Sequence, residues 1–289
     1  MIRFFTFSQF HNKQPPAGST YIRVNQLIKY WPEADLYKYG ENPEALIFQK
    51  VYCTPDYKFP AHFEGVKILD ICDPDWFDGV AIKETIDAVD AVTMPTQAMK
   101  DFIGQMTDKP CVVIPDRWDL EYVPKTMRRH KGLARKVVWF GYSHNAITLR
   151  PALALLEQLN LKLMVIANDD PLIPRFSDHI KDEAYEYHKF PEDRAELYQL
   201  LATADFAVLP TGRRPEDRFK SNNKDTQAIL AGLPVAKDED AVRKYMSAKE
   251  RNSFMHKEYS IIKEEYDVKK SIREYKELIA KLKTGKLQT

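Results

Sequence analysis

The chain has 289 residues, of which 44% are hydrophobic and 29% charged, and its formal net charge at pH 7 is +1. This length allows about two domains, and the composition is that of a globular protein rather than a disordered one. A net charge near zero excludes a global attraction to nucleic acid or membrane surfaces. No apolar run approaches the roughly 20 residues that a membrane-spanning helix needs.

The cysteines are few and scattered: Cys53, Cys72 and Cys111. An odd number without metal-ligand spacing indicates a reducing compartment and no metal cluster. Near the N-terminus, polar residues from Gln9 onward interrupt any signal-peptide core. We therefore expect a cytoplasmic protein without a membrane span, or one in the host cytoplasm if a virus encodes it.

The first 120 residues alternate between strand-like and helix-like segments. A polar loop at 8–19 precedes a helix through Tyr30 that Ser19 or Thr20 can cap, and Thr96 caps a later helix. The alternation predicts a parallel sheet with helices on both faces. The expected strands of this half are 2–7, 45–48, 66–71, 91–94 and 111–114.

Acidic residues cluster where the third of these strands ends, in the run Asp70-Ile71-Cys72-Asp73-Pro74-Asp75. In open α/β sheets, ligands bind at the carboxyl ends of the strands. An aspartate there could orient or deprotonate a hydroxyl group. It could equally form an Asx-turn before Pro74, and the sequence leaves both interpretations open.

The polar, basic segment 125–136 is predicted to be an interdomain linker, so we expect domains at 1–124 and 137–289. Alternatively, Arg128, Arg129 and Lys131 form a patch that contacts phosphates of a nucleic acid. The patch lacks the interleaved aromatic residues typical of such surfaces, which favours a solvated linker.

The second domain opens with a strand at 137–141 that runs into a glycine turn, Gly141-Tyr142-Ser143, and a helix at 146–160. A strand, a glycine and a helix N-terminus in this order suit a phosphate or a sugar hydroxyl. A dinucleotide-binding glycine pattern and a P-loop are both missing, which argues against those sites. Strands at 161–166 and 187–190 and a helix at 191–201 follow.

The stretch 204–236 reads as strand, loop, helix and strand. Its loop carries Arg213, Arg214, Arg218 and Lys220, and Ser221, Asn222 or Asn223 can cap the helix that Gly232 ends. A cationic loop that runs into a helix N-terminus is an anion site. The alternative is an ordinary βαβ unit with a solvated loop.

Two runs of this stretch, Phe219–Lys224 and Gln227–Val235, resemble the donor-site segment of GT-B glycosyltransferases, nearest to the GT4-like group. The runs 137–141 and 113–119 are similar to the start of the donor domain and the end of the acceptor domain in that family. The resemblance implies an α/β fold of two Rossmann-like domains facing each other across a cleft. It also implies that the helical tail, 240–282, returns to the first domain, although this tail could instead pack on its own domain.

The resemblance implies roles for individual residues. Catalytic roles fall to Lys220, which meets the diphosphate, and to Asp73, which faces the acceptor. Two departures stand out: Gln227 and Phe219 occupy the positions of the family's two glutamates, and the loop after Gly141 lacks the usual arginine and lysine. The donor-binding set is Gly141, Tyr142, Ser143, His188, Lys220, Ser221, Asn222, Asn223 and Gln227, and the acceptor or cleft set is His11, Ser19, Arg23 and Asp70.

The function that follows is transfer of a sugar from a UDP- or GDP-linked donor to an acceptor hydroxyl, without a metal or other cofactor. The acceptor is a glycan, a small molecule or a hydroxylated DNA base. Two other functions stay open: a nucleotide-sugar enzyme of the epimerase kind, and a binding protein that has kept the fold without the chemistry. His11 could also be a solvated loop histidine with no role.

Overall fold

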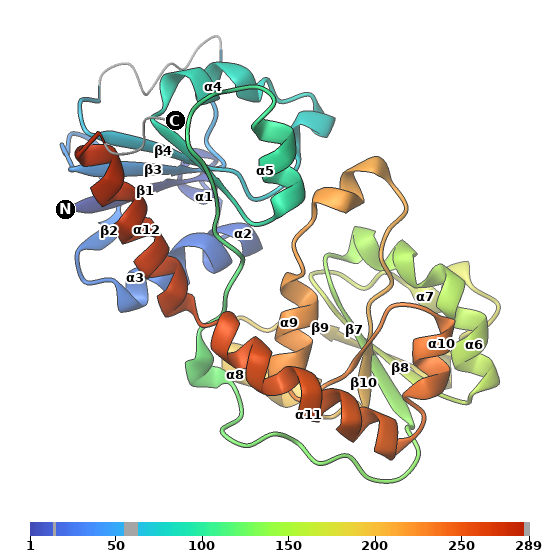
Figure 1. Ribbon diagram of the computed structural model, residues 1–289. Helices are drawn as coiled ribbons and strands as arrows, with labels where there is room; N and C mark the ends of the chain where they lie inside the picture. Colours follow the sequence, from blue (N-terminus) through green and yellow to red (C-terminus); the bar gives the residue numbers. More distant parts are fainter. Residues whose placement is uncertain (14–15, 55–62, 286–289) are drawn as a thin grey trace. The chain divides into compact units, whose positions relative to one another are not determined.

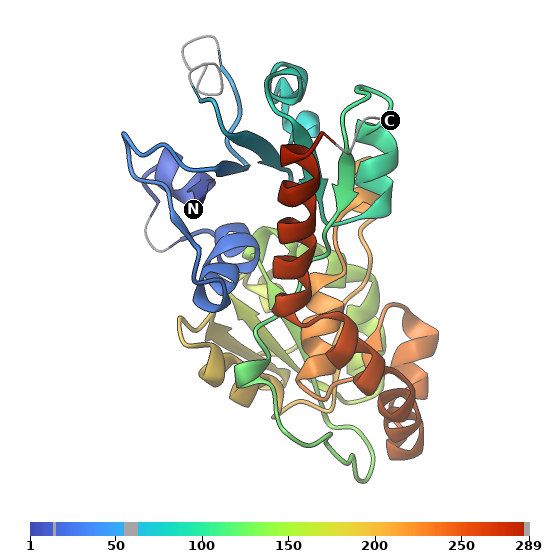
Figure 2. The ribbon, with the colours of Figure 1, turned by 60° about the vertical axis from the view of Figure 1, so that its left-hand side comes forward.

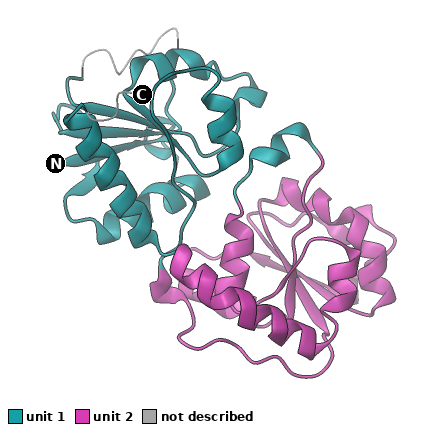
Figure 3. Cartoon of the chain, viewed as in Figure 1, with its two compact units in different colours: residues 1–119, 214–221, 266–289 teal, residues 120–213, 222–265 magenta. Residues whose placement is uncertain are grey.

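A computed structural model describes residues 1–13, 16–54 and 63–285 and divides the chain into two compact units. Unit 1 comprises residues 1–119, 214–221 and 266–289, and unit 2 comprises 120–213 and 222–265 (Figure 3). Residues 14 and 15 of the expected polar loop, and 286–289 of the expected second domain, lie outside the described residues. The units are thus not contiguous in sequence, because two segments of the second half belong to unit 1.

Unit 1 is built on a parallel sheet of six strands in the order β2-β1-β3-β4-β5-β6 (Figure 1). All the strands expected in this half are present, and β2 is an addition that the sequence did not indicate. The strands are β1 (Ile2–Thr6), β2 (Ala34–Leu36), β3 (Ala45–Gln49), β4 (Val66–Asp70), β5 (Ala91–Met94) and β6 (Cys111–Val113).

Helices cover both faces of this sheet. Ile47 of β3 faces one hydrophobic core, and its neighbours Leu46 and Phe48 face the other, because successive side chains of a strand alternate. The first core takes in α3 (Gln26–Tyr30) and α12 (Val268–Lys283), and the second takes in α4 (Ile82–Ala88) and α5 (Gln97–Ile103). Shorter helices of unit 1 are α1 (Phe7–Phe10), α2 (Gly18–Thr20), the π-helix Tyr21–Asn25 and 3₁₀ turns at Asp75–Asp78 and Pro215–Phe219.

Helix α12 shows on which unit the end of the helical tail packs. Its apolar stripe, which includes Ile272, Tyr275 and Ile279, is buried against Phe4, Trp31 and other residues of the first core of unit 1. Figure 2 shows α12 lying along the strands of this unit. The C-terminal helix therefore packs on the unit that holds the N-terminus, as the resemblance implied.

Unit 2 holds a parallel sheet of five strands in the order β11-β10-β7-β8-β9. Its central strand, β7, is buried throughout Val137–Phe140, as an apolar run between two helical layers must be. The strands are β7 (Lys136–Gly141), β8 (Lys162–Ala167), β9 (Tyr185–Lys189), β10 (Phe206–Val208) and β11 (Val235–Ala236). The helices are α6 (Leu153–Gln158), α7 (Ile173–Phe176), α8 (Arg194–Leu201), α9 (Asn223–Leu230), α10 (Glu239–Lys244) and α11 (Ala248–Glu265), with 3₁₀ segments at Leu120–Tyr122, Ser143–Ala152 and Asp182–Ala184.

Two local expectations are corrected. The helix expected at 146–160 is a 3₁₀ segment over Ser143–Ala152 followed by α6, and Pro151, which has no N–H to donate, lies inside it. The helix after the first loop begins at Gly18, and neither Ser19 nor Thr20 caps it. Thr96 does cap α5, because its side chain accepts a hydrogen bond from Met99 N.

The segment 125–136 is mostly exposed, but it lies within unit 2, which begins at residue 120, rather than at the boundary of the units. Arg128 donates hydrogen bonds to the carbonyl oxygens of Ala202 and Ala204, so it is not available as a phosphate contact. His130 is buried, with Nε2 3.0 Å from the carbonyl oxygen of Gly232. These contacts bind the segment to the body of unit 2.

Candidate functional site

Strand order places a candidate binding edge in unit 2. Strand β7 lies between β10 on one side and β8 on the other, so the chain reverses its direction of travel across the sheet at the β7–β10 pair. In open parallel sheets, ligands bind outside the carboxyl ends of the strands at such a reversal. In this unit the reversal is marked by Gly141, which ends β7, and by the end of β10 at Val208.

Gly141 makes a sharp exit from β7. Its φ of 147° lies in a region that other residues rarely adopt, so a glycine is favoured there. Ser143 N donates to Asn168 Oδ1 at 2.9 Å, which ties the turn to the end of β8. The predicted donor-binding residues Gly141, Tyr142 and Ser143 therefore do form one turn at the carboxyl edge of the sheet.

Lys224 supplies the positive charge that the turn itself lacks. A β-carbon built on Gly141 would lie 3.5 Å from both Cδ and Nζ of Lys224, so the lysine side chain lies directly beside the turn. The ammonium is 5.2 Å from the centre of the Trp139 ring. Lys224 belongs to the first turn of α9, where a cation opposes the helix dipole, and a bound anion would relieve that opposition. The sequence motif contained Lys224 but gave no reason to assign it a role.

The other predicted residues at and in α9 differ in their exposure to solvent. Asn222 is exposed at the N-cap position and its side chain makes no capping hydrogen bond, and Asn223 follows as the first helical residue. Gln227 is 3% exposed, and its Nε2 is buried without a hydrogen-bond partner among the described residues. The resemblance implies that Gln227 contacts the ribose of the donor, and this role stays a prediction, since a ribose would reach the buried side chain only after a local shift.

His188 lies on β9 and is engaged with a neighbour. Its Nε2 is 2.5 Å from Glu186 Oε1, and Lys136 and Lys162 also pair with Glu186, at 3.2 and 2.9 Å. Burial would raise the pKa of Glu186, but the hydrogen bonds from His188, Lys162 and Lys136 outweigh it and lower the pKa to about 2. His188 is therefore part of a charge cluster on the edge strand. The resemblance implies that the segment 188–191 lies near the donor base, and this role stays a prediction.

Lys220 and Ser221 belong to unit 1, not to the unit that holds Gly141. Lys220 Nζ is 3.0 Å from Asp217 Oδ1, and Ser221 Oγ donates to Asp116 Oδ2 at 2.6 Å. Burial would raise the pKa of Asp217, but hydrogen bonds from Lys220 and Arg214 lower it to about 2. In this structure Lys220 is therefore held by a carboxylate.

Phe219 explains why this segment belongs to unit 1. Its ring is 2% exposed and lies 5.1 Å from the ring of Trp76 and 5.4 Å from that of Phe102, centre to centre. Thr96 Oγ1 also donates to the carbonyl oxygen of Phe219 at 3.1 Å. Where the resembled family has a glutamate, this chain has an aromatic residue packed into a core.

Arg23 and Asp70, two of the predicted cleft residues, are core residues instead. They are 3% and 1% exposed, and Arg23 binds Asp70 through Nη2–Oδ1 at 2.5 Å and Asp116 through Nη1–Oδ1 at 3.1 Å. Tyr275 and Thr93 donate to the same Asp70 oxygen, at 2.9 and 2.7 Å. An acceptor could not reach these groups, because strand and helix side chains enclose them on all sides.

Asp73, in contrast, is half-exposed at the carboxyl end of β4. Its Oδ2 accepts from Lys50 Nζ at 2.7 Å, and the same ammonium is 3.0 Å from Asp75 Oδ1. Burial would lower the pKa of Lys50, but the acidic neighbours, among them Asp73 and Asp75, raise it further than burial lowers it. Lys50 itself has a left-handed backbone, with φ of 52°, which is uncommon for a residue other than glycine.

The remaining predicted cleft residues lie near the end of β1. His11 is exposed, and its ring packs on Phe7 at 4.4 Å and Phe10 at 4.9 Å. Ser19 is half-buried at the start of the helix that leads to α3. Among the described residues no three His, Cys, Asp or Glu side chains are grouped as a metal site requires, and metal independence stays a prediction.

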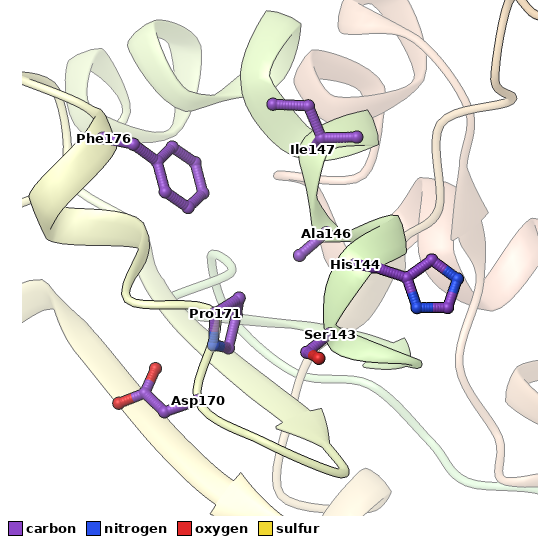
Figure 4. Close-up of a pocket in the computed structure, with 7 residues that line it drawn as sticks. All are labelled: Ser143, His144, Ala146, Ile147, Asp170, Pro171 and Phe176. Atoms are coloured by element: carbon purple, nitrogen blue, oxygen red, sulfur yellow. The ribbon is translucent and has the colours of Figure 1, made fainter.

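A pocket of about 320 Å³ opens beside the Gly141 turn, between the 3₁₀ segment Ser143–Ala152 and the chain that follows β8. In Figure 4 the ring of Phe176 and the methyl group of Ala146 point toward each other, and the ring of His144 points away from them. The residues that line the pocket are Ser143, His144, Ala146, Ile147, Asp170, Pro171 and Phe176.

By sequence, the chain matches no protein-family model and no curated protein. No helix in the described part of the chain is both long and apolar enough to cross a membrane. Structural likeness to solved proteins, however, is extensive.

The Anabaena protein Alr3699/HepE, in complex with UDP and glucose, has a TM-score of 0.66 at 10% identity, over 96% of this chain and 98% of HepE. TarM of S. aureus, in complex with fondaparinux, alpha-GlcNAc-glycerol and UDP, has a TM-score of 0.57 at 12% identity, over 81% of this chain and 55% of TarM. AviGT4, a glycosyltransferase involved in avilamycin A biosynthesis, has a TM-score of 0.54 at 13% identity, over 89% of this chain and 78% of AviGT4. The chain thus spans about half the length of TarM, and at these identities the likeness shows the fold: it is the GT-B fold of two Rossmann-like units.

Proposed function

We propose that this chain transfers a sugar from a nucleotide-sugar donor to an acceptor hydroxyl. The observation that carries the proposal is the ammonium of Lys224 beside the Gly141 turn, at the point where the strand order of unit 2 reverses. Sugar transfer expels a diphosphate, and placing positive charge where that negative charge develops is a large part of catalysis. The GT-B fold and the UDP complexes of HepE and TarM are consistent with this use of the unit.

On the donor side, the diphosphate binds at the start of α9. The ammonium of Lys224 and the positive end of the α9 dipole hold it, and the missing side chain of Gly141 lets it approach the backbone. Lys220 is proposed as a second cation for the diphosphate, which requires that it exchange its bond to Asp217 for one to the donor. Charge held in this way makes a metal unnecessary, so we expect activity to survive a chelator.

On the acceptor side, Asp73 is the proposed base. Its carboxylate is exposed, and Lys50 fixes one of its oxygens. The acceptor oxygen bonds to the anomeric carbon, the electron pair of the broken bond leaves with the nucleoside diphosphate, and the acceptor proton passes to Asp73. A glycan or a small hydroxylated molecule suits this site.

A hydroxylated DNA base is not carried forward as an acceptor. Two of the arginines that favoured it are engaged within the protein: Arg128 binds two carbonyl oxygens, and Arg214 pairs with Glu216 and Asp217. A surface that binds the phosphate backbone of a nucleic acid needs such charges, so a DNA acceptor is not favoured.

The proposal is tested with UDP, GDP and ADP and their sugars, first by thermal shift and then by product analysis. Lys224→Ala should weaken the binding of the stabilising nucleotide roughly 10- to 100-fold, the range that charge-assisted hydrogen bonds give. Lys249→Ala is the matched control, since Lys249 is the second residue of α11 as Lys224 is of α9, and it should change nothing. Lys220→Ala should lower turnover, and unchanged turnover would remove Lys220 from the proposed mechanism.

The products separate the other functions. A nucleotide sugar converted without any acceptor would indicate an epimerase-like enzyme. Tight nucleotide binding without turnover would indicate a binding protein, which the buried Phe219 at a family glutamate position favours as the second candidate. If no nucleotide and no nucleotide sugar stabilised the protein, the proposed function would be wrong.

A further inference from the structure

The basic segment 125–136, which the proposed function does not use, lies at the opposite edge of the unit 2 sheet from the Gly141 turn. Its last residue, Lys136, begins β7, whereas Gly141 ends that strand. The contact of His130 agrees with this placement, because the carbonyl oxygen of Gly232 that it reaches precedes β11. The segment therefore lies along the amino ends of the strands, away from the proposed donor site.

Most cations of this segment are exposed and have no partner of their own. In the part of the chain that the structure describes, no ion pair or side-chain hydrogen bond involves the exposed side chains of Lys125, Arg129, Lys131 and Arg135. The segment contains no aspartate or glutamate. The carboxylate of Asp205 faces it, but one oxygen accepts from the backbone N–H groups of Arg135 and Lys136. The other oxygen of Asp205 lies 3.9 Å from Arg128, so the exposed cations form a positive surface on a chain of nearly zero net charge.

A buried arginine of α11, the helix along which the segment runs, fixes the shape of the segment (Figure 1). Arg251 is 0% exposed, and its Nη2 donates to the carbonyl oxygens of Lys131 and Gly132 at 3.2 and 3.1 Å. Its Nη1 donates to the carbonyl oxygens of Tyr245 and Met246. Burial lowers the pKa of Arg251, and no carboxylate pairs with it among the described residues, so burying this charge costs free energy. The group that carries this cost holds the segment in one shape.

Leu133 directly follows the two residues that Arg251 holds, and it is 71% exposed. A single exposed leucine needs no explanation by itself. This one, however, stands in the chain between the unpaired cations Lys131 and Arg135, and its backbone is bridged to Ser247. An apolar side chain that a fixed loop presents among cations matches the chemistry of an anionic lipid surface, where phosphate groups lie above hydrocarbon.

We propose that the segment 125–135 binds an anionic membrane surface, with its cations at the lipid phosphates and Leu133 inserted beneath them. A nucleic acid would meet the same cations but would leave the leucine in water, and the segment has no Phe, Tyr or Trp on which bases could stack. The binding is reversible, because a few cations and one apolar side chain attract a membrane only weakly. The inference does not rest on sugar transfer, since this surface lies apart from the proposed donor site.

Sedimentation of the full chain with lipid vesicles tests the proposal. Vesicles of phosphatidylcholine with about 30% phosphatidylserine should bind the protein, and vesicles of phosphatidylcholine alone should bind it roughly tenfold or more weakly. Raising the salt concentration from about 0.1 M to about 1 M shortens the Debye length from about 10 Å to about 3 Å. This increase should release the protein from the anionic vesicles.

The double variant Arg129→Gln/Lys131→Gln should weaken binding to the anionic vesicles roughly 10- to 30-fold, because each cation near such a surface contributes about fivefold. Arg273→Gln/Lys281→Gln is the matched control. It removes the same charge from exposed positions of α12, whose side chains also have no partner in the described part of the chain. This control should bind the vesicles within about twofold of the wild type, since charges away from the surface are screened.

Leu133→Ser tests the insertion of the apolar side chain. It should weaken binding to the anionic vesicles roughly three- to tenfold, because the serine buries less apolar area in the lipid. Ile147→Ser is its control, since Ile147 is 56% exposed but follows the carboxyl end of β7, on the other edge of the sheet. The control should leave vesicle binding unchanged.

The inference is overturned if the protein binds neither kind of vesicle, or binds both equally. It is also overturned if Arg273→Gln/Lys281→Gln weakens binding as much as Arg129→Gln/Lys131→Gln, or if Leu133→Ser has no effect. Duplex DNA is measured in the same salt series, and binding to DNA that is tighter than binding to vesicles would assign the segment to a nucleic acid instead. The nucleotide measurements of the proposed function are separate, so either proposal can fail without the other.

Discussion

The carboxyl edges of the two sheets differ in how their charged side chains are arranged. In unit 1 each cation pairs with two carboxylates: Arg23 with Asp70 and Asp116, and Lys50 with Asp73 and Asp75. In unit 2, Lys224 lies beside a bare glycine turn and over an aromatic ring, at the start of a helix.

The difference matters because an edge of paired carboxylates and a lysine at a helix N-terminus suit different ligands. The carboxylate of Asp73 can accept a hydrogen bond, so the edge of unit 1 suits a neutral, hydroxyl-bearing molecule. A cation at a helix N-terminus attracts an anion. We therefore propose that one fold, used twice in one chain, provides one edge for an acceptor and one for a diphosphate. The predictions below test the two halves of this contrast.

The largest effect is expected from Arg23→Met. Removing one partner from a buried ion pair leaves the carboxylates of Asp70 and Asp116 without their cation, which costs about 3–5 kcal/mol of unfolding free energy. Urea denaturation measures the loss. Arg3→Met is the control, since the Arg3 pair with Glu41 is more exposed and should cost under about 1 kcal/mol. Equal losses for the two variants would show that the pairing of unit 1 is not what stabilises its edge.

Asp73→Asn should lower turnover with an acceptor about 100-fold, because an amide cannot take the acceptor proton. Nucleotide binding should stay at the wild-type value, since Asp73 belongs to unit 1 and Lys224 to unit 2. Initial rates and calorimetry on the same preparation measure the two quantities. A variant with full turnover would leave Asp73 as a structural partner of Lys50 alone, and the acceptor edge would need another base.

Much of the fold was readable from the sequence for a simple reason. Strands buried on both faces appear as continuous apolar runs, so 45–48 and 137–141 were recognisable as central strands. Strand β2 was missed because only Ala34–Leu36 take part and Ala34 alone is fully buried. The helix expected at 146–160 differs because Pro151 has no N–H to donate, and the chain around it forms a 3₁₀ segment instead.

The site was harder to predict, because its decisive contacts join residues far apart in sequence. Arg23 and Asp70 are 47 positions apart, and nothing local shows that they bury each other. Lys224 was visible in a motif, but only the folded chain brings it to Gly141. Polar residues in the sequence indicate that a site is near. The ion pairs and hydrogen bonds of the folded chain determine which of these residues remain accessible to a ligand.

The pH dependence of stability offers a third test, on the unit 2 side. Burial, with Arg128 and Arg251 nearby, lowers the pKa of His130 from 6.5 to about 4. Between these values the unfolded chain binds the proton and the folded chain does not, so stability falls as the pH falls from 6.5 to 4. The loss from pH 7 to pH 5 should be about 2 kcal/mol.

His130→Gln should remove this part of the pH dependence, measured as the difference in urea midpoint between pH 7 and pH 5. Burial raises the pKa values of Asp75 and Asp116 in unit 1, so these groups add stability as the pH falls and oppose His130. Both remain in the variant, and the difference between variant and wild type therefore isolates the histidine. An unchanged pH profile would mean that the pKa of His130 is the same in the folded and unfolded states.

The smallest effect is expected from Ser221→Ala, which tests the attachment of segment 214–221 to unit 1. The change removes the donor 2.6 Å from Asp116 Oδ2 and should cost about 1 kcal/mol, the usual value of one hydrogen bond. Ser253→Ala, at an exposed position of α11, is the control and should cost nothing measurable. The segment contains Arg214, Arg218 and Lys220, so trypsin reports its local opening as well. Faster cleavage at these residues in Ser221→Ala, with the rest of the chain intact, would show that Asp116 holds the segment. Unchanged cleavage would mean that the packing of Phe219 and its hydrogen bond from Thr96 suffice, and that the serine is dispensable.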